Sequence, residues 1–171
     1  MITFPFNGVE GLLSDSDKES LKAFAERCAD VLGDYFEIGS LRGLSSLCIC
    51  SGMPQGKNLH CFDFFEPDKF GDFMVNVVMA NCQNRVRIYM GDFRHAVFSN
   101  QPFAFGFVDH DHKLNTTIAA YEKFWPLLSP GGILAFHDFG HAVYPEPFDF
   151  LNTLPHRISL QETIIAFQKP K

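Results

Sequence analysis

The sequence predicts an α/β fold: a doubly wound, mostly parallel sheet of seven strands with helices on both faces. Strand and helix patterns alternate five times between Asp34 and Phe136, which is typical of parallel sheets. Two further apolar runs near the end of the chain predict a hairpin that adds an antiparallel strand. With 171 residues, the chain is long enough for a real core. We therefore expect one domain over residues 1–171, with a leader over residues 1–16.

The first helix is predicted from Asp17 to Leu32, because Ser16 and Glu19 have capping-box spacing and apolar residues then recur at helical intervals. Gly33 is predicted to end it. The other helices are expected at Leu44–Ser51, Pro67–Ala80, Asn115–Leu128 and Phe148–Leu154, with Ser129–Gly132 and the Pro-rich Tyr144–Pro147 as loops. The strands are expected at Asp34–Ile38, Leu59–Phe62, Val86–Tyr89, Phe103–Asp111, Ile133–Phe136, Ile158–Leu160 and Thr163–Phe167.

Composition excludes several classes of protein. The formal net charge is −6, which argues against a nucleic-acid binder or a protein of anionic membranes, since both need a basic patch. No apolar run approaches the roughly 18 residues of a membrane span, and the first residues lack a signal-peptide pattern. A cytoplasmic location is the expectation. Cys48 and Cys50 lack the second pair that a zinc site needs, so all five cysteines are predicted to be reduced thiols in or near the core.

The predicted fourth strand ends abruptly in polar residues. An apolar run with aromatic side chains, typical of a strand buried on both faces, leads into Asp109, His110, Asp111 and His112. Ligands of open parallel sheets bind beyond the carboxyl ends of the strands. These four residues therefore lie where chemistry is expected.

A glycine turn follows the first strand, in the segment Glu37–Gly43. Glycines there let a ligand approach the backbone, and the amino terminus of the next helix favours negative charge. Such a turn also needs glycine for its own geometry, and the fingerprint G-x-G-x-x-G is absent because Leu41 replaces its second glycine. Asp63 ends the next strand about 20 residues later, where an acidic residue can bind a ribose. The alternative is a surface aspartate that caps the following loop. Phe64 and Phe65 are candidates for the apolar wall of an adenine pocket.

Three motifs together resemble a known family. Phe36–Ser46 is similar to the first motif of class I S-adenosylmethionine-dependent methyltransferases, above all to the group related to metal-dependent macrolide-sugar O-methyltransferases (methyltransferase family 24-like), which writes it E-I-G-S-x-x-G-x-S-T. Val108–His112 resembles that group's I-D-G-D-H, and Leu127–Asp138 resembles its L-L-x-P-G-G-x-x-x-x-H-D. The resemblance implies a Rossmann-like sheet with a reversed last strand.

The resemblance also implies roles in binding S-adenosylmethionine. Glu37, Gly39, Ser40 and Gly43 would surround its methionine moiety, Asp63 would hold its ribose, and Asp92 would lie near the adenine amino group. The peptide from Gly91 to Phe93 would complete the adenine pocket. Asp109 would lie at the cofactor, at the metal and at the reaction centre.

A divalent metal is predicted at the ends of two neighbouring strands. Asp109, His137 and Asp138 can reach one ion, since neighbouring strands lie about 4.8 Å apart. The carboxylates suit Mg²⁺, Ca²⁺ or Mn²⁺, and the imidazole shifts the preference toward Mn²⁺, Fe²⁺ or Zn²⁺, so Mg²⁺ or Mn²⁺ is the expectation. The resemblance makes His112, three residues after Asp109, the general base. The alternative is that these groups only hydrogen-bond one another. His137 and Asp138 also point to opposite faces unless the chain turns there. His141 is either a further ligand or a solvated loop residue.

We therefore expect a methyltransferase that methylates oxygen on a small hydroxylated acceptor. His110, where the family has glycine, places a bulky side chain beside the reaction centre. Two alternatives remain: a metal-dependent hydrolase built on the Asp/His cluster, and an S-adenosylmethionine-binding protein without catalysis. Acceptor specificity would come from the leader, from the loop Phe139–Phe148, or from a second subunit of a homodimer.

Overall fold

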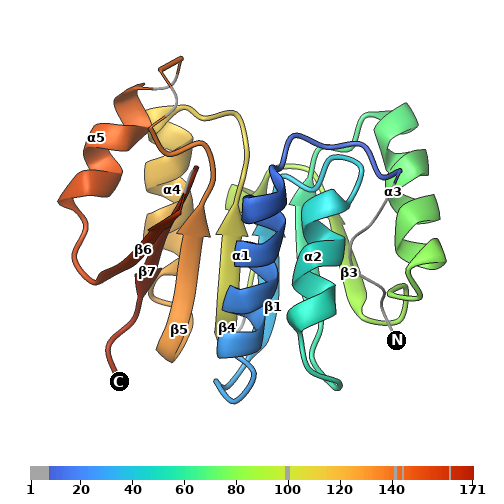
Figure 1. The fold of residues 1–171 in the computed structure, drawn as a ribbon, viewed down its shortest axis with the longest axis horizontal. Helices are drawn as coiled ribbons and strands as arrows, with labels where there is room; N and C mark the ends of the chain where they lie inside the picture. Colours follow the sequence, from blue (N-terminus) through green and yellow to red (C-terminus); the bar gives the residue numbers. More distant parts are fainter. Residues whose placement is uncertain (1–7, 99–100, 141, 144, 162) are drawn as a thin grey trace.

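The computed structural model describes residues 8–98, 101–140, 142–143, 145–161 and 163–171. Within them the chain forms a seven-stranded sheet in the order β3-β2-β1-β4-β5-β7-β6 (Figure 1). Its strands are β1 Asp34–Ile38, β2 Leu59–Asp63, β3 Val86–Met90, β4 Phe103–Val108, β5 Leu128–Phe136, β6 Arg157–Gln161 and β7 Ile164–Gln168. Strands β1 to β5 pair in parallel, and β7 is antiparallel to both β5 and β6. The predicted fold class is confirmed, including the reversed strand.

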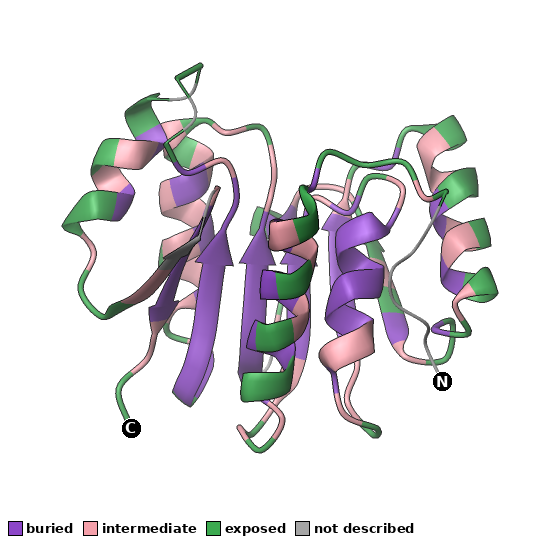
Figure 2. Cartoon of the chain, viewed as in Figure 1, coloured by how far each residue is buried: buried purple, intermediate pink, exposed green. Residues whose placement is uncertain are grey.

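Helices cover both faces of this sheet (Figure 1). They are α1 Asp15–Arg27, α2 Leu44–Gly52, α3 Pro67–Met79, α4 Leu114–Phe124 and α5 Pro145–Thr153, with a short 3₁₀ helix η1 at Phe93–His95. On one face, α1, α2 and α3 bury a core that includes Leu21, Leu47 and Phe73. On the other face, α4 and α5 bury a second core around Phe124 and Leu151. The central strands are therefore buried on both sides, as Figure 2 shows.

The prediction for α1 was wrong at both ends. The helix begins after Ser14, whose Oγ accepts a hydrogen bond from the backbone of Asp17, while the Asp17 carboxylate accepts one from the backbone of Ser14. This earlier capping box has the same spacing as the predicted one and buries Asp17. The helix ends at Arg27, and Gly33 serves the entry to β1 instead. There φ is +109°, and a Cβ would lie 2.3 Å from the Pro102 carbonyl oxygen.

Two predicted loops belong to regular elements. Ser129–Gly132 lies inside β5, where a register shift against β4 accommodates the extra residues, so α4 ends at Phe124 rather than Leu128. Helix α5 begins at Pro145 because the first turn of a helix tolerates proline, whose missing N–H is not needed there. Tyr144 and His141 lie outside the described residues.

The crevice of the sheet lies between β1 and β4, because the chain continues from β1 toward one edge of the sheet and from β4 toward the other. The strands remain very close just beyond their carboxyl ends, since Asp109 N donates a hydrogen bond to the Ile38 carbonyl oxygen (2.8 Å). Gly39 has φ +87°, and a Cβ there would lie 1.6 Å from the Asp109 carbonyl oxygen. A glycine is therefore required at position 39 by the packing of the two strands alone.

The five cysteines are free and buried, as predicted. None of the helices in the described parts of the chain is long and apolar enough to span a membrane.

Candidate functional site

A cavity of about 380 Å³ opens beyond the carboxyl ends of β1 to β4. This volume lies within the range of small-molecule sites. Of the predicted cofactor residues, the cavity is lined by Gly39, Ser40, Asp63, Phe64, Asp92, Phe93 and Asp109. The structure thus brings the turns after four strands to one site. Glu37 and Gly43 are not among its described lining residues.

Glu37 lies beneath the glycine turn and is fully buried. One carboxylate oxygen, Oε2, accepts hydrogen bonds from the hydroxyls of Ser40 and Ser46. The other, Oε1, has no partner among the described residues. Burial raises the pKa of Glu37 to about 7. Gly43 acts as N-cap of α2 with φ +91°. Glu37 and Gly43 shape the turn without lining the cavity. Ser40, which donates a hydrogen bond to Glu37, does line it.

Asp63 is engaged by the backbone around it. Its Oδ2 accepts hydrogen bonds from the N–H groups of Ser40 (2.8 Å) and Leu41 (2.9 Å), and its Oδ1 accepts one from Phe65 (2.7 Å). A carboxylate offers about four lone-pair positions, so room remains for one further donor such as a ribose hydroxyl. Asp63 therefore caps the following loop, as the alternative predicted, and also lines the cavity.

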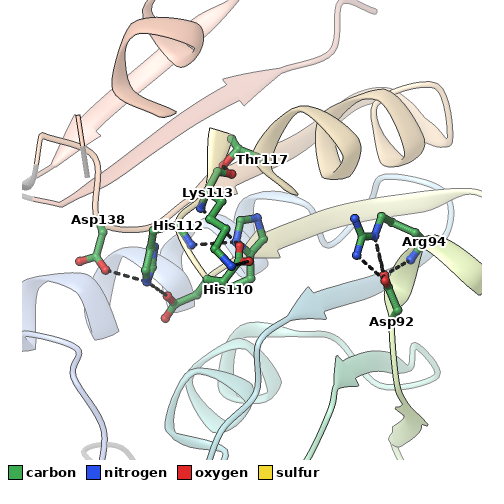
Figure 3. A network of polar contacts seen from close by, with 9 residues as sticks. Asp92, Arg94, His110, His112, Lys113, Thr117 and Asp138 are labelled. Atoms are coloured by element: carbon green, nitrogen blue, oxygen red, sulfur yellow. Dashed lines mark hydrogen bonds and ion pairs between the residues drawn. The ribbon is translucent and has the colours of Figure 1, made fainter. Parts of the chain in front are cut away.

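The far end of the cavity is aromatic and charged. Phe64 is 74% exposed at the cavity wall, whereas Phe65 packs in the core against Phe70 and Phe73, so placing Phe65 in the pocket was wrong. Asp92 N-caps η1, and Arg94 donates to both of its carboxylate oxygens, which lowers the pKa of Asp92 to about 2. Figure 3 shows this pair apart from the histidine group.

Phe93 and His110 present nearly parallel rings to the cavity. Their planes differ by 7° and their centroids are 6.4 Å apart. His110 Nδ1 accepts a hydrogen bond from the His112 backbone, whereas its buried Nε2 has no partner within the described residues. Burial lowers the pKa of His110 to about 4, so the ring is neutral at physiological pH. The bulky side chain predicted beside the reaction centre is thus an uncharged aromatic ring in the cavity wall.

The predicted metal ligands meet at the ends of β4 and β5. Asp109, His137 and Asp138 each offer one ligand atom, and these atoms lie within 4.8 Å of one another. His137 Nδ1 is 3.3 Å from Asp109 Oδ2 and 3.6 Å from Asp138 Oδ1. The chain does turn here, since β5 ends at Phe136 and Asp138 has φ +53°. That turn brings two consecutive side chains to one side.

His137 is almost completely buried, and neither ring nitrogen makes a hydrogen bond with a described residue. Burial alone would lower its pKa. The carboxylates of Asp109, Asp138 and Asp17 outweigh that effect and hold the pKa of His137 above its ordinary value. Two carboxylates and an imidazole aimed at one point, with the imidazole otherwise unsatisfied, suit a divalent cation.

His112 joins this group at the cavity wall. Its Nε2 lies 3.2 Å from Asp138 Oδ2 and 3.8 Å from Asp109 Oδ1, and Figure 3 shows His112 and Asp138 facing each other. His110 and His112 also line a small hollow of about 20 Å³ beside His137 and Asp138. The two histidines therefore lie between the large cavity and the ligands His137 and Asp138, whereas Asp109 lines the cavity itself.

Several residues that line the cavity were not predicted individually, although the leader was expected to contribute acceptor specificity. Glu10 to Leu13, in the predicted leader, line the cavity. Arg42 of the glycine turn lies 3.5 Å from Glu10 and also pairs with Asp72 of α3. Arg94 lines it as well. The apolar pair Leu12-Leu13 before a capping box was the one available signal for the leader, and nothing marked Arg94.

Comparisons with known proteins identify the family and the fold. A family model described as a methyltransferase domain matches residues 36–139, which is more than half of the chain. A search of curated proteins gave no match.

Several solved structures have a similar fold. An O-methyltransferase from Bacillus cereus in complex with SAH is 18% identical, covering 92% of this chain and 83% of that one, with a TM-score of 0.70. CalS11, a TDP-rhamnose 3'-O-methyltransferase of calicheamicin biosynthesis, is 19% identical over 89% and 78%, with a TM-score of 0.72. TomG from Streptomyces achromogenes, an O-methyltransferase in complex with SAM, is 15% identical over 92% and 82%, with a TM-score of 0.68.

Proposed function

Because the chain belongs to the methyltransferase family and has the class I fold, we propose that this S-adenosylmethionine-dependent enzyme methylates a hydroxyl oxygen of a small acceptor held beside a divalent metal. One observation carries the proposal. A single cavity joins the glycine turn, the acidic ends of β2 and β3, and the segment from Asp109 to His112. A methyl donor in that cavity would lie beside the metal-ligand group, because Asp109 belongs to both.

The charge of the cavity supports a cationic ligand. Its lining carries the carboxylates of Glu10, Asp63, Asp92, Asp109 and Asp111, against the guanidinium groups of Arg42 and Arg94. A cleft lined mainly by one sign of charge concentrates ligands of the opposite sign. S-adenosylmethionine carries a sulfonium, whereas nucleotides of similar size carry several negative charges. The lining therefore favours the sulfonium compound.

Each part of the donor has a counterpart among the lining residues. The remaining lone pair of Asp63 would accept a hydrogen bond from a ribose hydroxyl. The rings of Phe64, Phe93 and His110 would provide aromatic faces for adenine. Ser40 and the peptide groups of the glycine turn lie where the methionine end would reach. Glu37 keeps Ser40 in position from below. The protein thus aligns the donor, which is most of what methyl transfer to oxygen requires.

Asp109, His137 and Asp138 would hold the metal ion. When bound, such an ion lowers the pKa of acceptor hydroxyls and orients them. His112, held between Asp109 and Asp138, is placed to accept the hydroxyl proton. A positioned base of this kind contributes about 10²–10⁴-fold in rate. The neutral His110 ring limits the size of an acceptor that can approach this point.

The test measures binding and turnover separately. S-adenosylhomocysteine binding is measured by calorimetry, and methyl transfer to catechol and other small vicinal diols is followed by mass spectrometry with Mn²⁺ present. His112→Ala should lose about 10²–10⁴-fold in rate and keep its affinity for S-adenosylhomocysteine. His95→Ala, at an exposed histidine that does not line the cavity, serves as the matched control and should keep turnover. If His110→Gly loses turnover and His112→Ala retains it, the base assignment is wrong. Binding without turnover in the wild type and in His110→Gly would favour a non-catalytic protein.

A further inference from the structure

A buried carboxylate from another part of the chain lies behind the proposed metal ligand His137. Asp17, in the first turn of α1, is 2% exposed. Its Oδ2 accepts hydrogen bonds from the backbone and hydroxyl of Ser14, and its Oδ1 accepts one from the Thr163 hydroxyl (3.0 Å). Its Oδ2 also lies 3.6 Å from His137 Nε2. Asp17 thus joins the start of α1, the approach to β7 and the end of β5.

The two nitrogens of His137 face different groups. Nδ1 faces the carboxylates of Asp109 and Asp138, whereas Nε2 faces Asp17. A metal can bind Nδ1 only when its lone pair is free, which in a neutral imidazole requires the proton to be on Nε2. At 3.6 Å the contact with Asp17 is an ion-pair distance rather than a hydrogen bond. A buried carboxylate is little screened by water, so it still attracts a proton to the nitrogen that faces it. A cation bound at Nδ1 would offset the charges of Asp109 and Asp138, and the proton is then favoured on Nε2, which faces Asp17.

We propose that Asp17 is a positioning residue that holds His137 in the Nε2-protonated tautomer and turns Nδ1 toward the metal. The proposal rests on the metal site of the proposed function. Histidine ligands of metals commonly donate their second N–H to a carboxylate, which fixes the ring and makes the ligating nitrogen more basic. Here α1 supplies that carboxylate, and the capping box and Thr163 fix its orientation.

Helix capping alone does not account for this arrangement. An acidic residue that only stabilises the start of a helix can remain in solvent, as Asp15 of the same turn does, with a 94% exposed side chain. Burying a carboxylate is costly unless it is paired and hydrogen-bonded. Asp17 is buried directly against His137, and its other contacts come from two further segments. The burial of Asp17 is explained if its carboxylate orients His137.

The experiment measures Mn²⁺ affinity by calorimetry in three variants. Asp17→Asn keeps the size of the side chain and removes its charge, and we expect Mn²⁺ to bind 10- to 100-fold more weakly, the usual effect of losing an outer-shell partner. Asp15→Asn removes the same charge from the exposed side of the turn and should keep wild-type affinity. Ser14→Ala removes the capping hydroxyl and one of the hydrogen bonds that orient Asp17 but keeps the carboxylate. It should lower the melting temperature without metal and weaken Mn²⁺ binding far less than Asp17→Asn does.

A second measurement needs no variant. Long-range ¹H–¹⁵N spectra of the wild type with diamagnetic Mg²⁺ bound, at a pH where His137 is neutral, should show the Nε2-protonated tautomer. The Nδ1-protonated tautomer would overturn the proposal, as would equal Mn²⁺ affinity in Asp17→Asn and the wild type. A wild type that binds no Mn²⁺ would overturn it too. Binding of S-adenosylhomocysteine in that case shows that the methyltransferase assignment stands without the metal.

Discussion

The buried carboxyl group of Glu37 leads to a prediction about stability and pH. Glu37 is fully buried beneath the glycine turn, and one of its oxygens has no partner in the described part of the chain. Burial raises its pKa from 4.5 to about 7. We expect Glu37→Gln, which keeps the shape and removes the charge, to stabilise the protein at alkaline pH relative to the wild type.

The magnitude follows from the pKa shift. One pKa unit corresponds to about 1.4 kcal/mol, so a rise from 4.5 to about 7 makes ionised Glu37 unfavourable in the folded state by roughly 3 kcal/mol. The folded-state pKa lies above the unfolded value, so the folded protein binds the Glu37 proton more tightly than the unfolded chain does. The stability that protonated Glu37 contributes is fully present below about pH 4.5 and is lost as the pH rises through about 7. The wild type should therefore lose roughly 3 kcal/mol of unfolding free energy across that window relative to Glu37→Gln.

Urea denaturation at a series of pH values, with a chelator present, measures this difference. Glu122→Gln is the matched control, since it removes one carboxylate from an exposed position on α4. Its unfolding free energy should follow the wild-type pH profile. The reasoning is refuted if the profiles of the wild type and Glu37→Gln run parallel between about pH 4.5 and 8, because Glu37 would then gain no proton on folding.

Three further outcomes are expected. Asp63→Asn removes the negative charge that accepts hydrogen bonds from three backbone N–H groups, and it should weaken S-adenosylhomocysteine binding by about 1.5–3 kcal/mol. An unchanged affinity by calorimetry would show that Asp63 is not part of the binding site. Mn²⁺ should raise the melting temperature and a chelator reverse it, with Asp109→Asn and Asp138→Asn each abolishing the response; curves indifferent to both additions mean these residues are structural. Phe64→Ala should weaken S-adenosylhomocysteine binding by about 1–3 kcal/mol, the range for base stacking on an aromatic ring. The unfolding free energy from urea denaturation should change little, because the side chain is exposed. Unchanged binding with a lower unfolding free energy would place Phe64 in the core.

The sheet was predictable because its apolar runs are short and bounded by polar or glycine residues. Errors arose where two local signals compete. Ser14 and Ser16 are both followed three residues later by an acidic residue, and the capping box that forms is the one whose acidic residue, Asp17, is buried. Proline and glycine at Ser129–Gly132 indicated a loop, yet a register shift keeps the segment in β5.

The site was predictable to the extent that it follows strand ends. Asp109, His137 and Asp138 come together because β4 and β5 are neighbours. Contacts from α1 were not predictable, because no sequence pattern indicates that Asp17 reaches the end of β5. The roles of Gly39 and Glu37 in packing were hidden for the same reason. Their partners, the Asp109 backbone and two serine hydroxyls, are identified only by the folded geometry.

The most direct test of the central claim is calorimetric titration of the wild type with S-adenosylhomocysteine and, separately, with ATP. The account predicts that one S-adenosylhomocysteine binds per chain, because one cavity joins the glycine turn, Asp63 and the aromatic wall. It predicts that ATP binds far more weakly, because the mainly acidic lining repels three phosphates. No binding of S-adenosylhomocysteine, or an equal affinity for ATP, would contradict the account.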